Sequence, residues 1–133
     1  MIERKYADTK AAKAACAFVE GGWIPDIVPD DAVDIHEVHD LDVNLTWGCF
    51  KTQNLAAVRR DLSGLRATKT QRPIARRPSE IFRDFSWWPD TMRSASVELS
   101  EFRESPAAPG LDGCVVQVAI HAASGTVCFY RGV

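Results

Sequence analysis

The chain has no stretch of eighteen apolar residues, so the sequence predicts no membrane-spanning helix. Its first ten residues, MIERKYADTK, are charged and lack the apolar core of a secretory signal peptide, which predicts a cytoplasmic protein. An envelope-associated protein is the alternative if an N-terminal leader has been removed. Hydrophobic residues make up 46% of the chain and charged residues 26%, values that fit one globular domain over residues 1–133.

Several motifs of known chemistry are also missing. The chain has no C-x-x-C pair, no G-x-S-x-G nucleophile motif and no glycine-rich phosphate-binding loop. Four cysteines lie far apart in the sequence and among apolar residues: Cys16, Cys49, Cys114 and Cys128. A free cysteine in such surroundings behaves as a small buried hydrophobe, so the sequence predicts reduced, structural thiols.

A cysteine nucleophile would need a histidine beside it, for example His39 beside Cys49 or His121 beside Cys128. Reactive thiols also need an exposed, electropositive setting, which these apolar surroundings do not suggest. We therefore expect no catalytic residue and no cofactor.

The net charge of −2 conceals an uneven distribution of charges. Residues 20–42 contain eight acids and no lysine or arginine, whereas residues 51–77 contain eight bases and a single acid, Asp61. The two segments could lie close together and neutralise each other, or the basic segment could form a face for an anionic partner. Because the chain is not basic as a whole and shows no recognised nucleic-acid-binding motif, we expect neutralisation and no nucleic-acid partner.

The hydrophobic periodicity predicts an α+β fold. Apolar residues at helical spacing predict two amphipathic helices over residues 8–20 and 53–67, with Asp8 or Thr9 capping the first and Asn54 the second. Alternating polar and apolar residues predict two strands within residues 32–52, joined by a turn near residues 40–44. A strand near residues 94–102 and a C-terminal hairpin turning at residues 123–125 follow. The whole predicts an antiparallel sheet of about five strands with two main helices packed on one face.

The segment DIHEVHDLDVN, residues 34–44, gathers polar residues of the kinds found at metal and catalytic sites. The cluster consists of His36, Glu37, His39, Asp40, Asp42 and Asn44. Its last three members have the D-x-D-x-N spacing that opens an EF-hand loop, but Leu45 stands where that loop needs glycine and Lys51 where it needs glutamate. The two histidines would lie on opposite faces of a strand. We therefore expect no bound metal.

The same alternation would place Glu37 and His39 on the apolar face of the strand, where unpaired polar groups are costly. We predict that they belong to an internal hydrogen-bonded network, with an arginine from the basic segment as the partner of Glu37. The nearby Asp and Asn side chains are expected to accept hydrogen bonds from the backbone of a turn. The alternative is a small metal-dependent or hydrolytic enzyme that uses His36, Glu37, His39, Asp40 and Asp42.

The second candidate site is the arginine- and tryptophan-rich segment between residues 66 and 93. Its candidate binding residues are Trp87, Trp88, Arg72, Arg76 and Arg77. The tryptophans could pack in the core beneath the helices, or they could anchor a protein partner, since Trp and Arg are enriched in binding hot spots. We predict a non-enzymatic protein-interaction domain that binds another protein or a second copy through this segment or an open edge strand.

Residues 22–44, GWIPDIVPDDAVDIHEVHDLDVN, resemble a pattern found in small bacterial proteins: G-W-[IL]-P, a second proline, and then I-x-E-x-H-[DN]-x-D-x-N. The matching residues are Gly22, Trp23, Pro25, Pro29, Ile35, Glu37, His39, Asp40, Asp42 and Asn44. The WWP triplet at residues 87–89 and the terminal SGTVCFYR are similar to later parts of such proteins. Some of these proteins look like envelope lipoproteins, although this chain shows no lipobox. No activity is established for the group, so the resemblance implies a compact domain and no particular chemistry.

Overall fold

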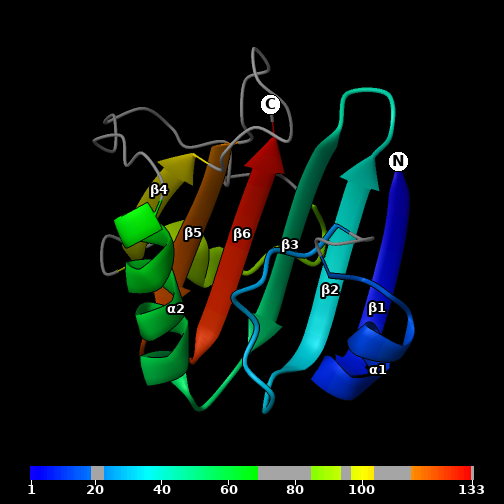
Figure 1. Ribbon diagram of the computed structural model, residues 1–133. Coiled ribbons are helices and arrows are strands. Elements are labelled where there is room, and N and C mark those ends of the chain that lie inside the picture. The colour runs from blue at the N-terminus through cyan, green and yellow to red at the C-terminus, as the bar shows by residue number, and fades with distance from the viewer. Residues whose placement is uncertain (19–22, 69–84, 94–96, 104–114, 133) are drawn as a thin grey trace.

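The computed structural model of the 133-residue chain describes residues 1–18, 23–68, 85–93, 97–103 and 115–132. Within them, six strands form one antiparallel sheet in the order β1-β2-β3-β6-β5-β4 (Figure 1). The strands are β1 (Ile2–Asp8), β2 (Val33–Asp40), β3 (Leu45–Lys51), β4 (Glu98–Arg103), β5 (Val115–His121) and β6 (Thr126–Gly132). The helices are α1 (Thr9–Ala14), α2 (Leu55–Thr68) and the short 3-10 helix η1 (Asp90–Arg93). The fold is therefore α+β, with six strands rather than about five.

The strand that the sequence did not reveal is β1. It lies at one edge of the sheet and most of its side chains are exposed, so its sequence IERKYAD shows no alternation of polar and apolar residues. It pairs with β2, with Arg4 opposite Glu37 and Tyr6 opposite Ile35. Charged side chains on such an edge oppose uncontrolled pairing with other chains.

The first helix begins as predicted but ends early. The Asp8 side chain caps α1 by accepting a hydrogen bond from the Ala11 N–H at 2.8 Å. The helix stops after Ala14, since Cys16 adopts a left-handed conformation with φ of 53°. The carbonyl of Ala17 then accepts hydrogen bonds from the N–H groups of Trp23 and Ile24, so this carbonyl is used by the following loop rather than by a longer helix.

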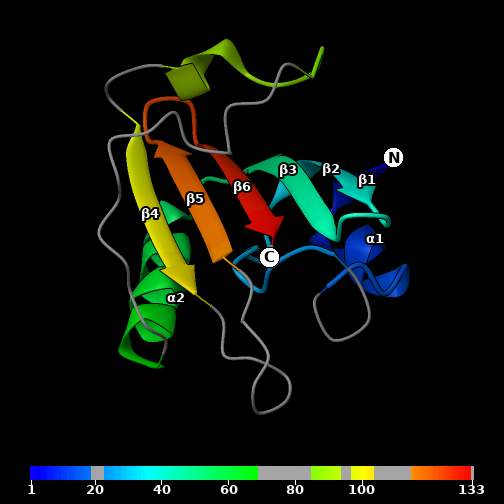
Figure 2. The ribbon, with the colours of Figure 1, turned by 90° about the horizontal axis from the view of Figure 1, so that it is seen from above.

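Both faces of the sheet are covered. On one face, α1, α2 and the loop after residue 23 pack over a cluster that includes Ala12, Ile24, Val58 and Phe129, and Figures 1 and 2 show both helices on this side. On the other face, the segment 85–93 with η1 covers a second cluster built around Trp47 (Figure 2). The central strands β3 and β6 are therefore buried on both faces, whereas the alternation within residues 32–52 predicted a strand buried on one face for β3.

The predicted turns and the second helix cap are present. The β2–β3 hairpin turns over residues 41–44, where Asp40 Oδ1 accepts a hydrogen bond from the Asp42 N–H at 3.0 Å and Asn44 has a φ of 54°. The Asn54 side chain accepts a hydrogen bond from the Ala57 N–H and caps α2. The short-range polar patterns of the sequence thus correspond to real backbone interactions.

The prediction of reduced thiols is wrong for two of the four cysteines. Cys49 of β3 and Cys128 of β6 lie directly opposite each other and form a disulfide. They are 79 residues apart in the sequence, so no local spacing could reveal the pair. Cys16 is an exposed free thiol, and Cys114 lies outside the described residues.

The centre of the sheet should tolerate no side chain at Gly48. A Cβ there would lie 2.3 Å from Phe129 Cζ and 2.7 Å from the His36 carbonyl oxygen. We expect Gly48→Ala to lower the free energy of unfolding by about 2–3 kcal/mol, the upper range for overpacking. The matched control is Gly64→Ala on α2, where a Cβ meets nothing within 4 Å and helix propensity should add about 0.5–1 kcal/mol. Urea unfolding measures both variants, and a change of stability in the same direction for the two would contradict the prediction.

Candidate functional site

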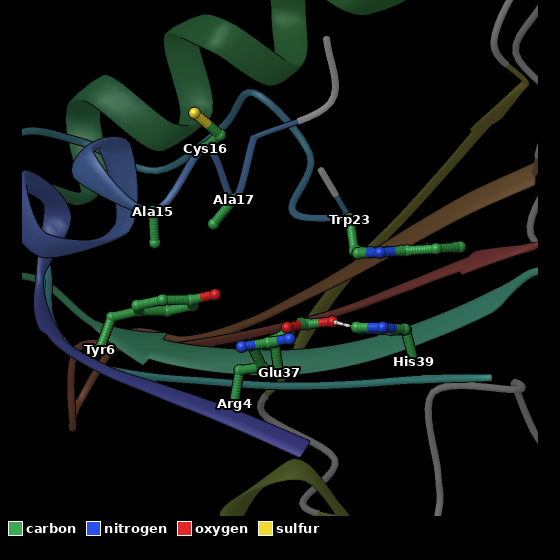
Figure 3. A pocket seen from close by; sticks show the side chains of 8 residues that line it. All are labelled: Arg4, Tyr6, Ala15, Cys16, Ala17, Trp23, Glu37 and His39. Atoms are coloured by element: carbon green, nitrogen blue, oxygen red, sulfur yellow. Dashed lines mark hydrogen bonds and ion pairs between the residues drawn. The ribbon is translucent and has the colours of Figure 1, made fainter. Parts of the chain in front are cut away.

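A pocket of about 240 Å³ lies on the helix-bearing face, where β1, β2 and the turn after α1 meet. Its lining residues are Arg4, Tyr6, Ala15, Cys16, Ala17, Trp23, Glu37 and His39. In Figure 3 the side chains from β1 and β2 form one side of the pocket and the turn after α1 lies across from them. The Trp23 ring lies beside His39 at one end. Four separate chain segments therefore build the site.

Strand pairing explains why these side chains converge. Arg4 lies directly opposite Glu37 in the β1–β2 pair, and directly opposite residues point to the same face of a sheet. Tyr6 and His39 are two residues farther along their strands, so they share that face. Glu37 and His39 are 1% and 3% exposed, on the buried face where alternation placed them.

Glu37 and His39 form a buried polar pair. His39 Nδ1 is hydrogen-bonded to Glu37 Oε1, and the Trp23 ring stacks on the imidazole with centroids 4.4 Å apart and planes 6° from parallel. The expected arginine partner from the basic segment is wrong for the described residues: the partner is His39, and the cation that acts on Glu37 is Arg4 of β1. Because the hydrogen bond to Glu37 and the stacked Trp23 ring both restrain it, the imidazole is held in one orientation.

Burial raises the pKa of Glu37 above the ordinary value of a glutamate. The hydrogen bond from His39 and the charges of His39 and Arg4 act in the opposite direction and do not cancel this effect. Burial also raises the pKa of Tyr6, and the nearby charge of Glu37 adds to that increase. The pocket therefore disfavours the charged forms of the Glu37 carboxyl group and the Tyr6 phenol.

This shift predicts how stability depends on pH. A carboxyl group with a raised pKa binds more protons in the folded state, so its stabilising contribution is complete below the unfolded pKa of about 4.3. The contribution is lost as pH rises through the higher folded pKa. We expect the difference in unfolding free energy between the natural chain and Glu37→Gln to fall across that window and to level off above it. Urea titrations between pH 4 and pH 8 measure this difference, and a difference that rose with pH would contradict the raised pKa.

The other polar residues of segment 34–44 lie elsewhere. His36 is on the opposite face of β2, 2.5 Å from Glu3 Oε1 and stacked on Trp87 with centroids 3.8 Å apart. Asp40 ends β2 and its side chain stabilises the hairpin turn, which contains Asp42 and Asn44. The structure thus divides the cluster into a buried pair, a histidine on the other face and a turn. In the part of the chain that the structure describes, no three His, Cys, Asp or Glu side chains are placed to hold a metal ion.

The tryptophan-rich segment packs on the sheet face opposite the helices. Trp88 is 7% exposed and joins the cluster with Trp47 and Met92. Trp87 is half-buried and stacks on His36 and on Phe85. The tryptophans therefore do not pack beneath the helices, and only Trp87 offers partly exposed surface to a partner. Arg72, Arg76 and Arg77 lie outside the described residues.

The ion pairs seen among the described residues do not join the acidic and basic segments. Arg59 of the basic segment binds Glu98 of β4 at 2.7 Å, and Lys13 of α1 binds Asp30 of the acidic segment. In the described parts of the chain, the acidic and basic segments therefore do not neutralise each other through ion pairs. Both pairs are on the surface, where ion pairs contribute little to stability.

Arg4 and Tyr6 are the site residues that the sequence analysis missed. They were missed because β1 was not recognised as a strand, and only strand pairing brings them beside Glu37. Trp23 was part of the resemblance pattern, together with Glu37 and His39, but the pattern gave no reason to place the three in contact.

The arrangement offers an oriented imidazole but no thiol to activate. Cys49 and Cys128 are joined to each other, and in Figure 3 the Cys16 side chain points away from the Glu37–His39 pair. Arg4 is exposed, lines the pocket and makes no ion pair or hydrogen bond with another described side chain. The pocket thus combines a buried pair, a half-buried tryptophan and an exposed guanidinium whose charge acts on Glu37.

None of the helices in the described ranges has the length and apolar character that a membrane crossing requires. No curated protein and no solved structure matches the chain. A family model described as the YbbD head domain matches residues 1–51. This segment ends with β3 and contains every residue that lines the pocket. The chain is similar to the YbbD head domain over this segment, and the pocket lies wholly within it.

Proposed function

We propose that this chain is a non-enzymatic domain that binds a protein partner through the pocket of Arg4, Tyr6, Trp23, Glu37 and His39. The observation that carries the proposal is the pocket wall, in which a half-buried Trp23 stacks on a buried, hydrogen-bonded His39. Tryptophan, tyrosine and arginine are the residues most enriched at the energetic centres of interfaces. A wall held in place before binding also reduces the entropy that binding costs.

The separation of the polar cluster supports binding over catalysis. The enzymatic alternative needs the polar side chains of residues 36–42 to converge on one substrate. His36 instead faces the other side of the sheet, while Asp40 at the end of β2 is hydrogen-bonded to the turn that contains Asp42. The remaining Glu37–His39 pair has the geometry of an oriented base, but the thiols of the described residues are not directed at it.

The disulfide supports a location in an oxidising compartment. Disulfides persist in the bacterial periplasm and outside cells, and are rare in the cytosol. Of the two locations that the sequence allows, we therefore propose the envelope-associated one. The resemblance to lipoprotein-like proteins agrees with this location.

Site-specific photocrosslinking tests the interaction. A photoreactive amino acid at the exposed pocket residue Ala15 should capture one main partner in the host cell, which mass spectrometry identifies and calorimetry then tests with both proteins purified. Trp23→Ala is expected to weaken binding at least tenfold, because losing a buried aromatic anchor typically costs 2 kcal/mol or more. The matched control is Trp87→Ala, which removes a half-buried tryptophan from the opposite face and should leave the affinity unchanged.

Three results would count against the proposal. One is a partner whose affinity depends on Trp87 and not on Trp23, which would move the interface to the other face. Another is equal loss of binding in both variants. The third is turnover of small ester, amide or phosphate substrates that disappears in His39→Gln, which would favour the enzymatic alternative.

A further inference from the structure

We propose that the pocket recognises a carboxylate group of its partner, bound by the Arg4 guanidinium with the Tyr6 hydroxyl beside it. This inference rests on the proposed function and specifies its chemistry. The carboxylate could belong to an acidic side chain or to the C-terminus of the partner. Both sources present the same planar anion to the pocket.

The distribution of charge in the pocket favours an anion. Glu37 is already hydrogen-bonded to His39, so its carboxyl group is committed within the fold. Arg4 makes no hydrogen bond or ion pair with another described side chain; its charge acts on Glu37, and the side chain also lines the pocket, where its N–H groups can bind a ligand. A cationic ligand would be repelled by Arg4 and would have to compete with His39 for Glu37. An anion meets neither obstacle.

The geometry of the donors fits a carboxylate. A guanidinium presents paired N–H groups in a planar fork that matches the two oxygens of a carboxylate, and such charge-assisted pairs are among the strongest hydrogen bonds. Figure 3 shows Arg4 and Tyr6 of β1 on the same side of Glu37, the side away from His39, with Arg4 beside the Glu37 carboxyl group. A ligand bound to Arg4 would therefore also lie close to the Tyr6 hydroxyl, which can donate a further hydrogen bond.

The size and the walls of the pocket fit a short group. Its volume of about 240 Å³ is below the range of about 300–1,000 Å³ that is usual for small-molecule and cofactor sites. The Trp23 ring and the methyl groups of Ala15 and Ala17 provide apolar walls for the few carbons that would carry the carboxylate. The pocket thus suits one side chain or one chain end of a larger partner.

Nuclear magnetic resonance titrations of the full chain test the inference with defined probes. N-acetylglutamate N-methylamide represents an acidic side chain and N-acetylglycine represents a C-terminus. The neutral N-acetylglutamine N-methylamide and methylammonium chloride are the comparison compounds. We expect at least one carboxylate probe to shift the Arg4 Nε–H and Trp23 indole resonances saturably, with the neutral probe at least fivefold weaker. The carboxylate probe that binds with the higher affinity shows whether the partner supplies an acidic side chain or a C-terminus.

Variants of two adjacent residues separate specific recognition from general charge. Arg4→Gln should weaken carboxylate binding about tenfold, the equivalent of one charge-assisted interaction. Arg4→Lys should retain part of the affinity, because it keeps the charge and loses the fork. Lys5→Gln is the matched control: it removes the same charge from the neighbouring residue of β1, whose side chain points to the other face, and should change nothing.

The inference is overturned if neither carboxylate binds, if methylammonium binds in their place, or if Arg4→Gln and Lys5→Gln weaken binding equally. Backbone amide spectra confirm that the exposed substitutions leave the fold intact. The two proposals fail separately. A crosslinked partner that still requires Trp23, without carboxylate binding, removes only the carboxylate inference. Carboxylate binding without any Trp23-dependent protein partner removes the proposed function.

Discussion

Replacing His39 with leucine is expected to lower the free energy of unfolding by about 3–5 kcal/mol at pH 7, the cost of leaving one member of a buried polar pair without its partner. Glu37 is 1% exposed, and its hydrogen-bond partner is His39. Leucine is close to histidine in size, so the loss reports the uncompensated carboxyl group rather than a cavity. The cost should be smaller near pH 4, where protonation removes the charge of Glu37. Urea unfolding at both pH values measures the difference.

Two further variants establish the cause. The double variant Glu37→Met/His39→Leu should recover most of the lost stability, since replacing both members of a buried pair by apolar residues is often neutral or stabilising. His36→Leu is the matched control on the same strand, because its partner Glu3 is half exposed, and it should cost less than about 1 kcal/mol. If the double variant were as unstable as His39→Leu, the loss would not come from the unpaired carboxyl group.

Removing the Cys49–Cys128 disulfide is expected to cost about 4 kcal/mol. The two cysteines are 79 residues apart, and a crosslink that closes a loop of this length restricts the unfolded chain by roughly that amount. The double variant Cys49→Ala/Cys128→Ala should therefore show a large decrease in the urea midpoint. The bond joins β3, the last strand of the segment similar to the YbbD head domain, to β6 near the C-terminus, so both parts should lose stability together.

The exposed free cysteine provides the control for this prediction. Cys16→Ala should change the unfolding free energy by less than about 0.5 kcal/mol. Alkylation of the unfolded, unreduced chain followed by peptide mapping should leave Cys49 and Cys128 unmodified. Modification of both residues, or a double variant as stable as the natural chain, would show that the bond does not form.

Most of the elements could be predicted from local sequence. The helix over residues 53–67 and the C-terminal hairpin were recognised because helical spacing and turn residues act within a few positions of the chain. The strand β1 was missed because an edge strand exposed to water carries no apolar alternation. The first helix was predicted too long, since its alanines favour a helix that the left-handed Cys16 and the loop contacts of Ala17 end at Ala14.

The candidate site was only half predictable. Glu37 and His39 were identified as polar residues on a buried face, since alternation along one strand is a local property. Their relation to Arg4 and Tyr6 depends on pairing with a strand about thirty residues earlier, and the Trp23 stack depends on a loop. The distribution of charge along the sequence favours an arginine of the basic segment as the partner of Glu37, because it carries no information about which strands pair.

The sequence by itself determined the α+β class, the turn at residues 41–44, the caps of α1 and α2, and the burial of Glu37 and His39. These features follow from side chains acting on their own backbone or from the two-residue period of a strand. Only the tertiary structure decided that β1 completes the pocket, that Cys49 meets Cys128, and that His36 lies apart from His39. The physical reason is that strand register brings together residues tens of positions apart, and one register among many is selected by the packing of both faces of the sheet.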